Sequence, residues 1–295
     1  MSTTIYYFSG TGNSLAVARE LAECLQAEFI SIVSVVSKDG IVTDSDQIGI
    51  VFPVYNHRIP FIVKRFAEKL REIGSKYVFA VCTYGDSPCI SLEYLSGIIH
   101  KAGGNLAFGI GIKMPYNYIL PSKGISGLFR PFVMKEISAQ ELDRLISGSR
   151  EKLEMICAAV KSNRVGSVEV EHRGIEHAVD FLNLRETLQK SVWLKIGGFR
   201  GKTDLSYIEC VQLMDHSFFS TDQCIRCGGC VRVCPTNNIT MTDSGPRWNH
   251  RCEQCFACLQ WCPKQAIQFG AGTDGGKRYH HPDVTLSDMF AQKNK

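Results

Sequence analysis

Eight cysteines near the C-terminus carry the clearest chemical signal in this chain of 295 residues. They form two copies of one spacing: Cys224, Cys227, Cys230 and Cys234 before Pro235, then Cys252, Cys255, Cys258 and Cys262 before Pro263. The second copy repeats the first at a shift of 28 residues, and the match extends past the cysteines, since Ile239 corresponds to Ile267. The chain therefore contains an internal repeat of a small structural unit.

Four thiolates at this spacing suit iron–sulfur chemistry, because a Cx2Cx2C turn wraps three soft ligands around one corner of a cubane cluster. The fourth ligand is expected to come from the other copy. The spacing thus predicts two 4Fe-4S clusters, one bound by Cys224, Cys227, Cys230 and Cys262, the other by Cys252, Cys255, Cys258 and Cys234.

Two alternatives to iron–sulfur clusters are disfavoured. Structural zinc sites usually pair two Cx2C turns across a longer gap, and disulfide scaffolds are typical of short secreted chains. The segment 217–270 resembles the bacterial ferredoxins with two 4Fe-4S clusters, including their Cys-Pro pairs. The resemblance implies a small α+β domain.

The N-terminal residues predict a strand, a tight loop and a helix. Residues 4–8 are β-branched or aromatic, and apolar residues recur at helical spacing from Leu15 onward. Backbone N–H groups, hydroxyls and a helix N-terminus can converge there on a terminal phosphate. ATP and NAD are disfavoured, because the loop has neither the P-loop lysine nor a GxGxxG pattern. The loop residues are Ser9, Gly10, Thr11, Gly12, Asn13 and Ser14.

Further strands alternate with helices along the first half of the chain. This alternation predicts an α/β fold with a doubly wound, five-stranded parallel sheet. Ligands bind such sheets at the carboxyl ends of the strands, where the loops 9–14, 53–58 and 83–88 are expected to meet. The remaining strands are predicted near 28–35, 47–55, 76–84 and 105–114, and the helices near 60–73 and 91–102.

The three loops resemble those of the flavodoxins, which bind FMN. The resemblance covers about residues 1–165 and implies that the first loop binds the ribityl phosphate while the other two hold the isoalloxazine ring. The ring residues it implies are Pro53, Val54, Tyr55, Asn56, Thr83, Tyr84, Gly85 and Asp86.

Individual ring neighbours have alternative roles. Tyr55 and Tyr84 would stack on the flavin, or be ordinary strand-end tyrosines. Asn56 and Asp86 are candidates for hydrogen bonds to the ring edge. The pair at 57–58, His-Arg, would either place positive charge near the ring or remain solvated.

An irregular stretch at 115–135 has the length of a lid or docking loop. Its aromatic residues Tyr116, Tyr118 and Phe129 either face cofactor or substrate, or simply pack. A helix follows, with Ser138 as its predicted N-cap residue. The sequence is thus divided into a flavodoxin-like domain (1–165), a helical connector (166–215), a ferredoxin domain (216–275) and a C-terminal tail (276–295).

Five cysteines lie outside the cluster motifs. A free cysteine packs as a small hydrophobe, which is the expectation for all of them. Cys89 lies just beyond a predicted flavin loop, where a thiol could also meet a substrate. The five are Cys24, Cys82, Cys89, Cys157 and Cys210.

Composition excludes several functional classes. Hydrophobic residues make up 44% and charged residues 21%, as in soluble globular proteins. No apolar run approaches the roughly 18 residues that span a bilayer, and no signal peptide opens the chain, so a cytoplasmic protein is expected. The formal charge of +4 falls to about −2 once eight thiolates, two cluster cores and a flavin phosphate are counted. Lysines and arginines are scattered, which disfavours nucleic-acid binding.

The whole chain resembles the flavodoxin-ferredoxin fusion proteins of anaerobic bacteria and archaea. This resemblance implies redox work in a low-oxygen habitat. One hypothesis is an electron carrier that serves a redox partner protein, such as a ferredoxin or an oxidoreductase. The alternative is a reductase that passes electrons from its flavin to a small molecule under the 115–135 loop. The sequence is compatible with a homodimer and does not fix the oligomeric state.

Overall fold

The computed structural model describes residues 1–119, 121, 137–199 and 204–293, which group into two compact units. The first unit contains the described residues of Met1–Tyr116, Ile137–Arg173 and His281–Lys295. The second contains those of Asn117–Glu136 and Gly174–His280. The predicted connector (166–215) is therefore split between the two units after Arg173. The predicted tail (276–295) is split as well, because the chain returns to the first unit at His281.

A single sheet organises the first unit. Its strands run parallel in the order β2-β1-β3-β4-β5, so the predicted doubly wound, five-stranded sheet is confirmed. The central strand β3 is buried over nearly its whole length, which explains its continuous apolar sequence. The strands are β1 (Thr3–Tyr7), β2 (Glu28–Ser31), β3 (Gln47–Pro53), β4 (Tyr77–Tyr84) and β5 (Leu106–Lys113).

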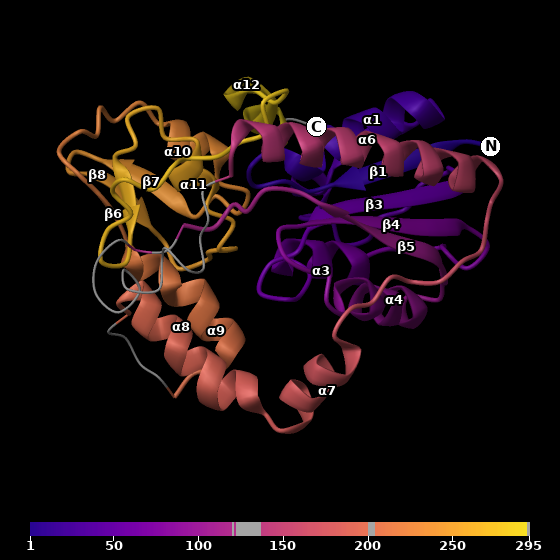
Figure 1. The fold of residues 1–295 in the computed structure, drawn as a ribbon, viewed down its shortest axis with the longest axis horizontal. Coiled ribbons are helices and arrows are strands. Elements are labelled where there is room, and N and C mark those ends of the chain that lie inside the picture. The colour runs from indigo at the N-terminus through magenta and orange to yellow at the C-terminus, as the bar shows by residue number, and fades with distance from the viewer. Residues whose placement is uncertain (120, 122–136, 200–203, 294–295) are drawn as a thin grey trace. The chain divides into compact units, whose positions relative to one another are not determined.

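Helices cover both faces of this sheet (Figure 1). On one face lie α1 (Asn13–Leu25) and α6 (Ala139–Lys161), and on the other lie α3 (Phe61–Glu68) and α4 (Ser91–Lys101). The Ser138 hydroxyl accepts a hydrogen bond from the Glu141 N–H at 3.1 Å and caps α6, as the sequence predicts. The short helix α12 (Leu286–Ala291) completes the unit.

Two predicted elements are shorter in the structure. The strand predicted over 28–35 ends at Ser31, because the Ser31 hydroxyl accepts from the Val33 N–H at 3.2 Å and caps the short helix α2 (Ile32–Val35). The helix predicted over 60–73 ends at Glu68, and Glu72 then takes a left-handed φ of 58°.

The second unit begins with helices. The predicted helical connector (166–215) contains several helices, of which α7 and α8 are separated by a π-helical turn. Among the described residues, no helix combines the length and apolar character needed to cross a bilayer. The helical segments are α7 (Arg173–Phe181), the π turn (Arg185–Gln189), α8 (Lys190–Gly197), α9 (Tyr207–Leu213) and a 3-10 turn (Met214–Ser217).

The rest of the second unit repeats one strand-helix-strand pattern. The copies interlock, since the first strand of one pairs antiparallel with the last strand of the other, as β6 with β9 and β7 with β8. Phe218, Phe256 and Phe269 form its aromatic centre, with ring centroids 4.8–5.5 Å apart. The elements are β6 (Phe218–Ser220), α10 (Gly229–Val233), β7 (Ile239–Thr242), β8 (Gly245–Trp248), α11 (Ala257–Gln260) and β9 (Ile267–Phe269).

Candidate functional site

The three predicted flavin loops meet at the carboxyl ends of the strands. The Ser14 hydroxyl in the first loop lies 2.8 Å from the Thr83 hydroxyl in the third. The Val54 N–H of the second loop donates to the Thr83 carbonyl, also at 2.8 Å. The Asn13 side-chain amide donates to the Pro115 carbonyl after β5, at 3.1 Å. Parallel strands place these ends on one edge, and hydrogen bonds join the loops there.

The first loop has the donor set of an anion site. Gly12 takes φ 96° just before α1, and the first turn of α1 carries no acidic residue. The Gly12 N–H donates to the Ser9 hydroxyl at 3.0 Å, which leaves the hydroxyl proton of Ser9 to donate elsewhere. Hydroxyls and a positive helix end suit an anion, so this loop has the features of a phosphate site. The buried polar side chains are those of Ser9, Thr11, Asn13 and Ser14.

The second loop is a tight hairpin turn. Tyr55 and Arg58 exchange backbone hydrogen bonds of 2.9 Å, and Asn56 and His57 both have positive φ. The Tyr55 ring meets Phe8 edge-to-face at 6.3 Å. The Arg58 guanidinium lies over the Tyr94 ring, 5.4 Å from its centroid, while His57 is exposed. The Arg58 charge therefore lies beside Tyr94.

The third loop begins at Tyr84, the last residue of β4. The Tyr84 ring packs on β5, where a Cβ on Gly111 would meet it at 2.6 Å. Burial raises the pKa of Tyr84 to about 12, and Glu169 and Glu171 add to the rise. Tyr84 thus packs against β5, and its stacking on a flavin stays a prediction.

Two further aromatic residues lie in different units. The Tyr116 ring covers the third loop, since a Cβ on Gly85 would meet it at 2.6 Å. Burial raises the pKa of Tyr116, and Asp86 contributes by charge and by a hydrogen bond. Tyr118 instead packs in the second unit, against Trp193 and Phe256. Phe129 and most of the predicted 115–135 loop lie outside the described residues.

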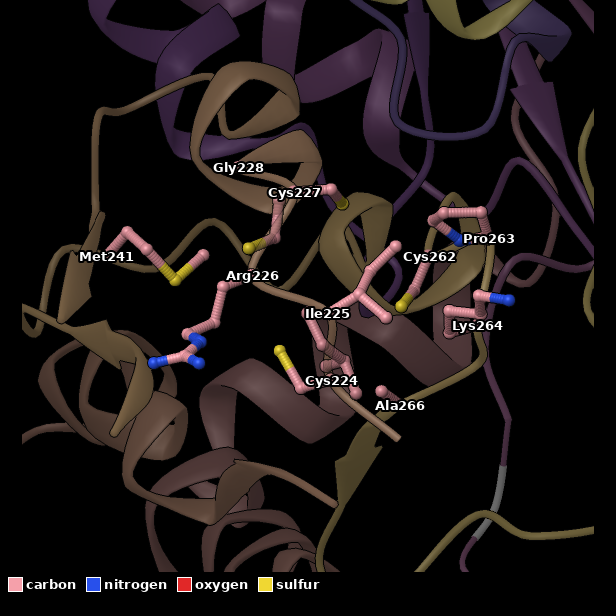
Figure 2. Close-up of a pocket in the computed structure, with 12 residues that line it drawn as sticks. Cys224, Ile225, Arg226, Cys227, Gly228, Met241, Cys262, Pro263, Lys264 and Ala266 are labelled. Carbon is pink, nitrogen blue, oxygen red and sulfur yellow. The ribbon is translucent and has the colours of Figure 1, made fainter. Parts of the chain in front are cut away.

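The first predicted set of cluster cysteines lines one cavity in the second unit (Figure 2). Cys224, Cys227 and Cys230 come from the first copy of the motif, and Cys262 comes from the second. Burial raises the pKa of Cys230 to about 11, and the other three cysteines of the set add to the rise. Cys262 therefore lies beside the three cysteines of the first copy, and its role as a ligand stays a prediction.

The second set converges in the same way. Burial raises the pKa of Cys255 to about 12, with Cys234 the next largest cause. Burial also raises the pKa of Cys258 well above its usual value, followed by the charges of Cys255, Cys234 and Cys230. These thiols lie close enough to disfavour one another's ionisation. A cationic iron–sulfur core would offset that repulsion and favour four thiolates together.

Backbone and side-chain hydrogen bonds hold this second set in place. The Asn238 N–H donates to the Cys234 sulfur, and the Gln254 N–H to the Cys252 sulfur, both at 3.3 Å. The buried Asp215 carboxylate accepts from the Asn238 amide and from the His250 N–H, both at 2.8 Å. Asp215 thereby ties the segment before Cys252 to the segment after Cys234.

The Trp248 indole is a further candidate donor to a cluster sulfur, Cys258. Its N–H is buried. A side-chain hydrogen bond from Trp248 lowers the pKa of the Cys258 thiol, although burial raises this pKa more. A donor directed at a ligand sulfur stabilises the reduced cluster.

Replacing Trp248 by phenylalanine should therefore lower the reduction potential of the cluster on Cys252, Cys255 and Cys258. We expect a shift of about 40 mV, since a hydrogen bond of about 1 kcal/mol corresponds to that potential in a one-electron couple. An EPR-monitored redox titration measures it. Trp193→Phe is the control, because its buried indole packs on Tyr118. Equal shifts in both variants would contradict this role of Trp248.

Sequence reasoning missed two features of the first unit. Cys24 of α1 and Cys157 of α6 form a disulfide with Cα atoms 6.4 Å apart, so the expectation of free packed cysteines is wrong for this pair. The reason is that α1 and α6 cover the same face of the sheet (Figure 1). The second feature is the contact of the C-terminal residues with the first loop. Neither feature has a local sequence signal.

Comparisons with known proteins match both parts of the chain. A family model for a flavodoxin domain matches residues 4–88, and one for a 4Fe-4S dicluster domain matches residues 216–263. A search of the curated proteins found no match.

Several solved structures match part of this chain. The two-electron reduced flavodoxin of Megasphaera elsdenii has 22% identity, 38% coverage of this chain, 85% coverage of its own and a TM-score of 0.31. A flavodoxin from the Archaea has 13% identity and a TM-score of 0.31, and the match covers 53% of this chain and 99% of the flavodoxin. An azoreductase from Bacillus anthracis has 10% identity and a TM-score of 0.34, and the match covers 53% of this chain and 99% of the azoreductase. The strand order and the two family matches are what identify the domains.

Proposed function

We propose that this chain, which joins an N-terminal flavodoxin domain to a C-terminal 4Fe-4S dicluster domain, moves electrons between two 4Fe-4S clusters and an FMN for a partner protein. An electron-transfer redox role follows from the two domains. A flavin exchanges one or two electrons and each cubane exchanges one, so the pair can convert one-electron into two-electron transfer.

One observation carries the proposal: two complete sets of four cysteines converge in a chain that also has a phosphate-type loop. Each set takes three cysteines from one copy of the motif and one from the other. Such sets supply the ligands of two clusters. The first loop would hold the FMN phosphate, and the 53–58 and 83–86 segments would border the ring.

The partner we propose is a ferredoxin or a partner oxidoreductase in the cytoplasm of a low-oxygen organism. The first loop has no nicotinamide fingerprint, so electrons need not arrive as hydride from NADH. A one-electron donor protein suits thiolate-bound clusters, whose potentials depend on the hydrogen bonds and burial around sulfur.

A reductase of a small molecule is the second candidate, and Tyr116 favours it. Its ring covers Gly85 in the third loop while remaining 46% exposed. An aromatic side chain in that position can cover a flat substrate at the flavin.

Cofactor analysis of anaerobically prepared protein tests the proposal. We expect about eight irons per chain and one released FMN. About four irons would contradict the two-cluster version, and FAD or no flavin in folded protein would contradict the phosphate assignment.

An acceptor screen separates the two candidate functions. After photoreduction of the flavin, the carrier function predicts rapid oxidation only by a protein acceptor. Multiple turnovers with a small molecule and no protein partner would support the reductase.

A further inference from the structure

The described residues at the C-terminus, 281–293, pack on the first loop of the sheet domain although the ferredoxin-type unit precedes them in sequence. We call them the C-terminal segment. Its helix α12 is opened by a capping box between Thr285 and Asp288. Arg19 of α1 anchors it, with an ion pair to Asp288 at 3.0 Å and a hydrogen bond to the Asp283 carbonyl at 3.3 Å.

The segment binds the backbone of the loop directly. The Gln292 side-chain carbonyl accepts from the Ser9 N–H at 3.2 Å, and its amide donates to the Ser9 carbonyl at 3.3 Å. The His281 N–H donates to the Thr11 carbonyl at 2.9 Å. Gln292 is only 4% exposed, so water does not compete effectively for these bonds.

Side chains of the segment also close the space beside Gly12. A Cβ on Gly12 would lie 3.0 Å from the Val284 Cβ and 3.1 Å from the His281 Cβ. Val284 and His281 are each 2% exposed. The His281 Nδ1 accepts from the Asp283 N–H at 3.3 Å, so the ring proton of the neutral imidazole lies on Nε2. The loop and the segment therefore form one packed unit.

We propose that residues 281–293 are a fourth segment of the FMN site: they hold the 9–14 loop in its phosphate-binding conformation, and Gln292 is the positioning residue. The inference rests on the proposed binding of FMN. The loop contains two glycines and no lysine or arginine, so its affinity depends on the placement of neutral donors. Ordering those donors before binding raises the fraction of competent molecules and thus the apparent affinity.

The test compares FMN with riboflavin, which lacks the phosphate. Full-length protein with its clusters assembled is stripped of flavin, and each flavin is titrated by fluorescence quenching. Gln292→Met keeps the length of the side chain and removes both bonds to Ser9. We expect FMN affinity to fall about tenfold with riboflavin affinity unchanged, because only the phosphate contacts the loop.

Gln268→Met is the matched control. Gln268 is equally buried, and its side chain accepts from the Thr273 N–H at 2.8 Å in the other unit, so FMN affinity should not change. Gln292→Glu is the second variant: it keeps the acceptor for the Ser9 N–H but loses the donor to the Ser9 carbonyl. It adds negative charge beside the loop, so a larger loss for FMN is expected.

Three results would overturn the inference. They are an unchanged FMN affinity in Gln292→Met, an equal loss for FMN and riboflavin, and a gain for FMN, which would show that the amide competes with the phosphate. Failure of the unsubstituted protein to bind either flavin would instead contradict the proposed flavin function, and with it this inference.

Discussion

Serine at both Cys258 and Cys262 is expected to abolish both clusters, whereas serine at both Cys224 and Cys262 is expected to abolish only one. Cys262 lines the cavity of Cys224, Cys227 and Cys230, although Cys258 is its neighbour in sequence. A cubane that loses thiolate ligands is lost or degraded. Anaerobic iron and sulfide analysis should therefore give near zero irons in the first double variant and about four in the second.

The comparison is decisive because both variants lose two ligands. If each copy of the motif bound its own cluster, the two results would be exchanged. Cys210→Ser serves as the control, since Cys210 is a buried free thiol of α9 outside both sets. It should keep about eight irons, as the unsubstituted protein does.

The cluster cysteines could be predicted because their signal is local. Three predicted ligands of each set lie within one Cx2Cx2C segment, and the 28-residue repeat supplies the fourth cysteine from the other copy. The strands follow the same repeat. A shift of 28 residues relates Phe218 to Pro246 and Met241 to Phe269. Phe218 pairs with Phe269, and Met241 pairs with Pro246 in the equivalent way. The local cysteine spacing thus predicts which distant cysteines come together, because the fold repeats the same unit with approximate two-fold symmetry.

The parallel sheet was also predictable, but the directions of its aromatic side chains were not. Tyr84 is the last residue of β4, and the β5 residue beside its ring depends on the pairing with β5, where the register shifts between Val78 and Phe79. Gly111 on β5 then leaves room for the Tyr84 ring. Tyr116 occupies the space over Gly85 instead. Register and bulges of this kind follow from tertiary packing and leave no periodic signal.

The C-terminal segment shows the same limit over a longer range. Gln292 and Ser9 are 283 residues apart, and the bonds between them join two backbone groups to one side-chain amide. The sequence around each residue is ordinary. The sequence predicts only a tail at 276–295, because no local pattern identifies the surface on which a short helix packs.

Replacing Gly12 by valine is expected to cost the protein about a hundredfold in FMN affinity. Gly12 has φ 96°, which costs a residue with a Cβ about 1–2 kcal/mol, and more for a β-branched one. Its Cβ would also press on Val284 and His281, and overpacking of this kind costs about 1–3 kcal/mol. The loop must move, and its phosphate donors move with it. Fluorescence titration with FMN measures the loss.

Gly148→Ala provides the matched glycine control for this substitution. Gly148 is an exposed residue of α6, and a Cβ added to it would meet no atom within 4 Å. Alanine should therefore raise helix stability by about 0.5–1 kcal/mol and leave FMN affinity unchanged. Iron content should stay at the unsubstituted level in both variants, because the clusters lie in the other unit. FMN affinity within threefold of the unsubstituted protein in Gly12→Val would show that the 9–14 loop does not bind the phosphate, whatever binds the ring.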